Sequence, residues 1–105
     1  MSVRRGVAVA LALAGATAGA RAADAERVEA GRKLYVASCQ RCHGINLVTG
    51  SIGFDLRTFP PQDKERFVRS VTHGLRQMPA WGGTLTAEQI DLIWGYVGTV
   101  NGWKE

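Results

Sequence analysis

Cys39-Gln40-Arg41-Cys42-His43 has the spacing Cys-x-x-Cys-His, the attachment motif for a c-type haem, which is far more specific than Cys-x-x-Cys alone. Cysteines three positions apart lie about one helical turn apart, so both sulfurs can reach the two vinyl groups of one porphyrin and form thioethers. His43 follows directly and can bring its imidazole to the iron from the same side. The motif therefore predicts one covalently attached haem c, with Cys39 and Cys42 holding the porphyrin and His43 binding the iron.

Other uses of the two cysteines stay open at this point. An oxidising compartment permits a disulfide between them, but a thiol-redox motif usually lies beside a βαβ pattern, and no stretch of this sequence alternates with period two over strand length. A structural zinc site needs four ligands, and the motif reaches that number only if the distant His73 joins it. The third alternative is coincidence. Haem attachment is favoured over all three.

A second iron ligand is offered by Gly74-Leu75-Arg76-Gln77-Met78-Pro79-Ala80-Trp81, a segment without helical or strand periodicity. Met78 is the only methionine besides Met1. Methionine commonly fills gaps in a core, but a loop methionine fixed by a following proline, downstream of a haem-binding histidine, fits a thioether axial ligand, and His/Met ligation raises the haem potential. Met78 is therefore the predicted sixth ligand. His73, otherwise a polar residue on the exposed side of a helix end, is its main competitor.

The first 22 residues have the three parts of a secretory signal. Arg4-Arg5 lies near the start, an apolar run covers residues 6–20, and Ala20-Arg21-Ala22 fits a small-x-small cleavage site. The 15 residues of the run fall short of the roughly 20 that a membrane-spanning helix needs, so an uncleaved anchor is disfavoured. We expect a signal peptide over 1–22, one haem-binding domain over 23–105, and no membrane span after cleavage. Haem attachment to the motif takes place outside the cytoplasm, which agrees with a periplasmic location.

Removal of the signal also changes the net charge, which is +4 for the whole chain. Three of the 13 Lys and Arg residues lie in the signal, which leaves 10 against 9 Asp and Glu and a mature charge of +1. Two ionised propionates would bring the haem-loaded protein to about −1, so there is no electrostatic case for nucleic-acid binding.

Removing 22 of 105 residues leaves 83, a size at which a protein core rarely supplies more than about 3 to 5 kcal/mol. A covalently held haem would supplement that core.

Three helical stretches are expected in the mature part. The first covers about 24–38, with acidic residues early and basic residues late, as the helix dipole favours. The second begins near residue 62 or 63, behind two prolines, and stops at Gly74. The last follows the capping-box sequence Thr86-Ala87-Glu88-Gln89 and ends near residue 101 or 102. The side chains expected to face inward are Phe67, Val68 and Val71 in the second helix and Ile90, Ile93, Trp94 and Val97 in the last.

Three segments make the chain similar to the class I c-type cytochrome family over about residues 28–100. Gly31-Arg32-Lys33-Leu34-Tyr35, leading into the Cys-x-x-Cys-His motif, resembles the family's first helix and haem site. Met78-Pro79-Ala80-Trp81 resembles its axial-methionine loop, and residues 90–97 resemble its last helix. The resemblance implies an all-α cytochrome c fold of three to four helices around one haem. It also implies that the first and last helices cross, with Gly31 allowing close approach and Tyr35 or Trp94 filling the crossing.

Gly53-Phe54-Asp55-Leu56 resembles the segment in which this family usually has Gly-Pro, whose proline carbonyl accepts a hydrogen bond from the haem-ligating histidine. Phe54 stands in the place of the proline, so a backbone carbonyl is still available to orient His43, while the rigidity of the loop is reduced. The resemblance makes Leu56 and Phe59 candidates for packing on the haem. Arg57 is either a partner for a propionate or a solvated loop cation.

The resemblance implies an electron carrier rather than an enzyme. If His43 and Met78 fill both axial positions, the iron has no site open for a substrate. A weaker resemblance, to small cytochromes that accept electrons from quinoprotein alcohol dehydrogenases, makes a quinoprotein dehydrogenase and a terminal oxidase the candidate partners of a monomeric carrier. Two alternatives stay open: a haem-based sensor or minor haem enzyme with a labile sixth ligand, and a cytochrome subunit fixed in a dehydrogenase or oxidase complex.

Overall fold

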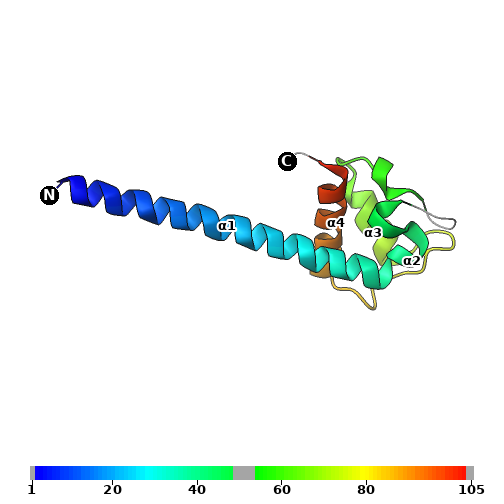
Figure 1. Cartoon of the computed structure of the whole chain (residues 1–105). Coiled ribbons are helices and arrows are strands. Elements are labelled where there is room, and N and C mark those ends of the chain that lie inside the picture. Colours follow the sequence, from blue (N-terminus) through cyan, green and yellow to red (C-terminus); the bar gives the residue numbers. More distant parts are fainter. Residues whose placement is uncertain (1, 49–53, 104–105) are drawn as a thin grey trace.

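Two long helices, α1 (Ser2–Ser38) and α4 (Ala87–Asn101), cross in this computed structural model and organise the fold. Figure 1 shows α4 lying against the C-terminal part of α1, with α2 (Gln40–His43) and α3 (Lys64–His73) grouped around the same end. Each of these elements contributes to the region around the Cys-x-x-Cys-His motif. The crossing of the first and last helices, which the sequence predicted, is confirmed.

Two short 3-10 helices, η1 (Ile45–Leu47) and η2 (Leu56–Thr58), complete the set of elements. The structure describes residues 2–48 and 54–103. Within those ranges the only β feature is an isolated antiparallel bridge between Leu75 and Met78. The expected all-α fold is therefore confirmed.

The first helix begins earlier than expected. The sequence predicted a helix over about 24–38, and α1 ends at Ser38 as predicted but begins at Ser2. The added stretch is rich in alanine, the strongest helix former, and no proline interrupts residues 2–38. Figure 1 shows this blue part of α1 extending away from the other helices. The expected signal over 1–22 occupies the extension, apart from residue 1, which lies outside the described residues.

No helix in the described ranges combines the length and the apolar character that crossing a membrane requires.

The helix crossing depends on Gly31 in α1. Gly31 is buried, and a Cβ atom placed on it would lie 2.0 Å from the backbone oxygen of Leu92 in α4. One turn further along α1, Tyr35 is fully buried and its ring centroid lies 5.3 Å from that of Tyr96. Both predictions for this crossing, close approach at Gly31 and filling by Tyr35, are confirmed. Trp94 has its aromatic contacts elsewhere, with Phe59, Phe67 and Trp103.

We expect Gly31→Ala to destabilise the protein by about 3 kcal/mol or more, since the added methyl group forces two backbones apart in a packed interface. In a domain of this size each kcal/mol shifts Tm by about 4–8 °C, so thermal unfolding of the haem-loaded protein measures the effect. Gly95→Ala in α4 is the matched control because its Cβ position is open, with no atom within 4 Å apart from its own stretch of helix. That variant should gain up to about 1 kcal/mol from helix propensity. Equal Tm values for the two variants would contradict the account of the crossing.

The other two predicted helices lie where the sequence placed them. The Thr86 hydroxyl accepts from the Gln89 amide (3.1 Å), and the Gln89 side chain accepts from the Thr86 amide (2.9 Å), so the capping box that starts α4 is confirmed. Helix α3 follows Asp63 and ends at Gly74, whose φ of 81° favours glycine. Residues that these helices bury are Phe67 and Val71 in α3 and Ile90, Ile93, Tyr96 and Val97 in α4, with Val68 and Trp94 partly buried.

Candidate haem-binding site

The Cys-x-x-Cys-His motif forms a helical turn that continues directly from α1. The Cys39 amide donates to the Tyr35 carbonyl (2.8 Å), and the His43 amide donates to the Cys39 carbonyl (2.9 Å). The two cysteines therefore lie one turn apart, the arrangement that the spacing predicted. Cys39 is buried and Cys42 is half-buried. Burial raises the pKa of the Cys39 thiol to about 11, so this side chain is protonated at neutral pH.

The Tyr35 hydroxyl fixes the chain just beyond the motif. It donates a hydrogen bond to the Gly44 carbonyl at 2.6 Å. Gly44 has a φ of 86°, which glycine adopts without strain, and it follows His43 directly. Burial raises the pKa of the Tyr35 phenol, so the hydroxyl remains a donor at neutral pH. The residue that fills the helix crossing thus also holds the turn after the candidate iron ligand.

His43 is oriented by the backbone of the loop that precedes η2. Its Nδ1 atom lies 2.8 Å from the Phe54 carbonyl oxygen. A carbonyl oxygen can only accept, so Nδ1 carries the proton and Nε2 keeps its lone pair for a metal. A ligating histidine almost always donates its other ring N–H in this way. The carbonyl at position 54 is therefore in place although phenylalanine replaces proline there.

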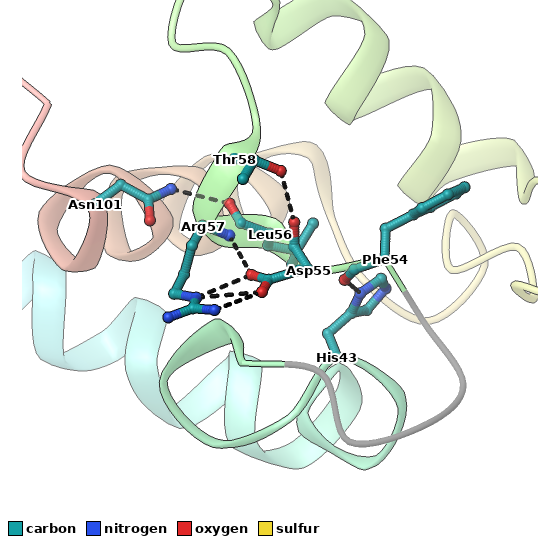
Figure 2. A network of polar contacts seen from close by, with 7 residues as sticks. All are labelled: His43, Phe54, Asp55, Leu56, Arg57, Thr58 and Asn101. Carbon is teal, nitrogen blue, oxygen red and sulfur yellow. Dashed lines mark hydrogen bonds and ion pairs between the residues drawn. The ribbon is translucent and has the colours of Figure 1, made fainter.

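Figure 2 shows how the chain around this carbonyl is arranged. Asp55 caps η2 by accepting from the Arg57 amide (2.9 Å), and the Arg57 guanidinium donates to the same carboxylate at 2.7 Å. These hydrogen bonds hold the pKa of Asp55 below its usual range. The sequence left Arg57 as either a propionate partner or a solvated cation. In the structure its guanidinium is the partner of Asp55, within its own turn.

Met78 lies in a tight turn that is pinned to the end of α3. The Met78 amide donates to the Leu75 carbonyl (2.9 Å), and the Leu75 amide donates to the Met78 carbonyl (3.2 Å). A Cβ atom on Gly74 would lie 2.8 Å from the Met78 carbonyl oxygen, so the turn packs closely on the helix end. Two further backbone hydrogen bonds anchor the loop to α3: Trp81 to Val71 (2.8 Å) and Gly82 to Thr72 (3.0 Å). Backbone hydrogen bonds thus fix the turn that carries Met78, whose side chain is partly buried against the core.

The predicted site residues meet around two adjoining cavities. The larger, of about 610 Å³, is lined by Cys39, Cys42, His43 and Met78 together with Ser38, Arg41, Phe54, Leu75, Arg76, Gln77, Pro79 and Trp81. The smaller, of about 270 Å³, shares Cys39, His43 and Met78 and reaches Leu56 and Phe59. Ligand-binding cavities commonly measure about 300–1,000 Å³ and are mainly apolar. The structure therefore brings all four candidate residues to one space of suitable size.

The donor atoms around these cavities fit a haem. Imidazole nitrogen and thioether sulfur are both axial ligands of haem iron, and His43 and Met78 supply them from α2 and from the loop after α3. The competitor His73 is exposed in the last turn of α3 and lines neither cavity. The zinc alternative needs His73 beside the motif, and residues 2–48 and 54–103 contain no group of three His, Cys, Asp or Glu that could hold a metal.

Sequence reasoning missed two kinds of residue at the site. Arg41 and Arg76 line the larger cavity, one from the motif and one from the methionine turn. Asn101 at the end of α4 donates to the Leu56 carbonyl at 3.0 Å, beside the loop that orients His43. The two arginines could have been noticed as basic neighbours of predicted ligands. Asn101 gave no signal because its partner lies 45 positions away in the sequence.

Comparison with known proteins finds a matching family and several relatives over most of the chain. The model of the family described as "Cytochrome C oxidase, cbb3-type, subunit III" matches residues 26–97. The chain is 37% identical over 76 residues to "Quinohemoprotein alcohol dehydrogenase ADH-IIG" of Pseudomonas putida, an alignment that covers 70% of this chain and 11% of that protein. It is 36% identical over 72 residues to "Cytochrome c6" of Microcystis aeruginosa, covering 64% of this chain and 89% of that protein.

A second cytochrome c6, from Aphanizomenon flos-aquae, is 37% identical over 82 residues, covering 71% of this chain and 94% of that protein. This chain thus spans a small part of the dehydrogenase and nearly all of each of these two cytochromes c6. The matched residues 26–97 include the motif, the Phe54 loop and Met78. The similarity therefore covers every candidate ligand.

Proposed function

This chain belongs to the c-type cytochrome family described as cytochrome c oxidase, cbb3-type, subunit III, and from that membership we propose that it is a periplasmic carrier of single electrons whose haem iron is held by His43 and Met78. Membership itself means that the chain is an electron-transfer domain with covalent haem c, and that it is not an enzyme. The ligand set, the location and the partners are the added parts of the proposal.

The observation that carries the ligand set is the convergence of four side chains on one cavity. Cys39 and Cys42 would form the thioethers, since they lie one turn apart and face the same space as His43. His43 would bind the iron through Nε2, because its Nδ1 is hydrogen-bonded to the Phe54 carbonyl. Met78 would bind from a different element, the turn after α3. When bound, the haem supplies a one-electron iron couple.

The residues around the iron would favour transfer of electrons over binding of substrates. A methionine thioether raises the haem potential, and backbone hydrogen bonds hold the turn that carries Met78 against the end of α3. The hydrogen bonds of Tyr35 to the Gly44 carbonyl and of His43 to the Phe54 carbonyl hold the segment around His43. If His43 and Met78 both held the iron, no place on it would be left for a substrate. A sensor or minor haem enzyme would instead need Met78 to leave the iron easily.

The lining of the larger cavity indicates the kind of partner. Arg41 and Arg76 contribute positive charge, and the described lining residues include no Asp or Glu. Leu75 (48% exposed) and Phe54 (66% exposed) add apolar surface beside them. Weak electron-transfer interfaces are small, and complementary charge speeds their formation. We therefore infer transient docking of a monomeric carrier to a partner surface that carries carboxylates.

The relatives suggest classes of partner. One similar protein is named a quinohemoprotein alcohol dehydrogenase, and the family is described as an oxidase subunit. For this chain we infer a quinoprotein dehydrogenase as electron donor and a terminal oxidase as acceptor. A cytochrome fixed permanently in such a complex would co-purify with it, whereas the carrier we propose would not. Export through a signal over 1–22 would place it in the periplasm.

Carbon monoxide tests the carrier proposal directly. We expect the dithionite-reduced protein to keep its visible spectrum unchanged under carbon monoxide, because His43 and Met78, as the two proposed ligands, would leave the gas no place on the iron. Denatured protein, in which Met78 is released, is the control and should bind the gas. Rapid binding by the native protein would contradict the closed site and favour a sensor or a haem enzyme.

A further inference from the structure

The peptide that orients His43 needs a support of its own. Its carbonyl belongs to Phe54, which lacks the ring by which a proline would fix φ near −65°. The His43 hydrogen bond depends on the direction of this carbonyl, since the Nδ1 to oxygen distance is only 2.8 Å. Something other than residue 54 must hold the segment in place.

One support lies within the turn that follows. The Asp55 carboxylate accepts from the Arg57 amide at 2.9 Å and from the Arg57 guanidinium, with 2.7 Å as the shortest contact. The Thr58 hydroxyl donates to the Asp55 carbonyl at 3.2 Å. Asp55 is therefore bonded through its side chain and its backbone immediately after the Phe54 carbonyl. These bonds hold the residue that shares a peptide group with the Phe54 carbonyl.

The second support comes from α4. Asn101 donates through Nδ2 to the Leu56 carbonyl at 3.0 Å, across 45 positions of sequence, and Leu56 is itself buried at 9% exposure. Figure 2 shows the Asn101 amide reaching the turn from one side while the Phe54 carbonyl meets His43 on the other. Helix α4 packs on α1, which leads into the motif. Helix α1 therefore contacts α4, α4 holds η2 through Asn101, and the residue just before Asp55 contacts His43, which follows α1 in the chain.

We propose that Asp55 and Asn101 are positioning residues for His43, which hold the Phe54 carbonyl against the imidazole and so set how strongly the ring donates to iron. This inference rests on the proposed function, in that His43 must be the iron ligand. A hydrogen bond from Nδ1 raises the basicity of the ligand. A more basic ligand favours ferric iron, so an intact network keeps the potential lower than it would otherwise be.

The test replaces Asn101 with the similarly sized but apolar leucine. In Asn101→Leu we expect the ratio of reduced to oxidised protein at a fixed applied potential to rise about threefold, a shift of about 28 mV, because a tenfold change corresponds to 59 mV for one electron. The His43 ring N–H, followed by NMR in the ferrous protein, should exchange with solvent several-fold faster. A role in stability alone would lower Tm without moving either quantity.

The matched control is Thr99→Val, two positions earlier in α4. It also removes a side-chain hydrogen bond to backbone, from the Thr99 hydroxyl to the Gly95 carbonyl at 3.0 Å, but it does not touch the turn. Its potential should equal that of the wild type. Asp55→Ala gives a second route if the leucine variant folds poorly. It should raise the potential in the same direction, and Asp55→Ser, which can still cap the turn, should restore part of the difference.

The outcomes separate this inference from the proposed function. A wild-type protein without covalent haem, or with haem but without methionine ligation, would show that the proposed function fails. If wild type and variants all show haem and methionine ligation, but the potential and the ring N–H exchange are the same in every one, the positioning role is overturned. A shift in Thr99→Val equal to that in Asn101→Leu would also overturn it.

Discussion

Changing both Cys39 and Cys42 to serine is expected to abolish stable haem attachment and to leave little folded protein. Neither thioether can form, and the haem would be held only through its iron. The chain beyond the expected signal has 83 of the 105 residues, a size at which the polypeptide core alone rarely supplies more than about 3 to 5 kcal/mol. The cysteines also line the cavity of about 610 Å³. Without haem in this cavity, the side chains that line it would lose their packing partner.

Haem staining after denaturing electrophoresis and the yield of soluble protein measure this prediction. Gln40→Ser is the matched control, since it lies between the two cysteines in the same helical turn and contributes no sulfur. The control should show a stained band and normal yield. A double variant that accumulates at the level of the control, with the same helical content, would contradict the view that covalent haem completes the core.

Met78→Ala is expected to keep the covalent haem but to open the sixth position and lower the potential. The thioethers and His43 are untouched, while the iron loses a ligand that favours the ferrous state. We expect a fall of more than about 59 mV, which is a tenfold change in the one-electron equilibrium. Redox titration measures the fall, and the reduced variant should now bind carbon monoxide.

His73→Ala checks that the effect belongs to the Met78 sulfur. It removes the competing ligand and should have no effect, because His73 is exposed and lines neither cavity. An unchanged potential in Met78→Ala would remove methionine from the iron.

Much of the fold could be predicted from local sequence signals. The capping box at Thr86 depends on residues three positions apart, and both of its hydrogen bonds are present. The end of α3 at Gly74 follows from a residue that tolerates positive φ. The close approach at Gly31 came from the family resemblance, and the 2.0 Å distance to Leu92 confirms it. Such features depend on short segments or on a recurring motif.

Other features could not be predicted because they depend on contacts between distant segments. Asn101 meets Leu56 only after α4 has packed on α1. The pairing of Tyr35 with Gly44 requires the turn after the motif to fold back on α1. Arg57 illustrates a different case: the sequence left it as a propionate partner or a solvated cation, and the pairing with Asp55, only two positions away, was not considered.

Helix α1 contains the whole stretch predicted for the mature part, about 24–38, and extends beyond it through the segment predicted to be a signal. Helix propensity does not stop at an expected cleavage site, and the alanine-rich segment continues the helix to Ser2. Cleavage after Ala22 remains a prediction, which mass measurement of the exported protein would check.

A visible absorption spectrum of the mature protein, produced with the cytochrome c maturation machinery, tests the central claim most directly. The oxidised and dithionite-reduced forms should both show haem bands, and the oxidised form should show the weak band near the red end that reports methionine bound to ferric iron. Haem bands without that signature would move the sixth ligand to His73 or leave the position open. The absence of any haem band would contradict the account altogether and return Cys39 and Cys42 to thiol chemistry.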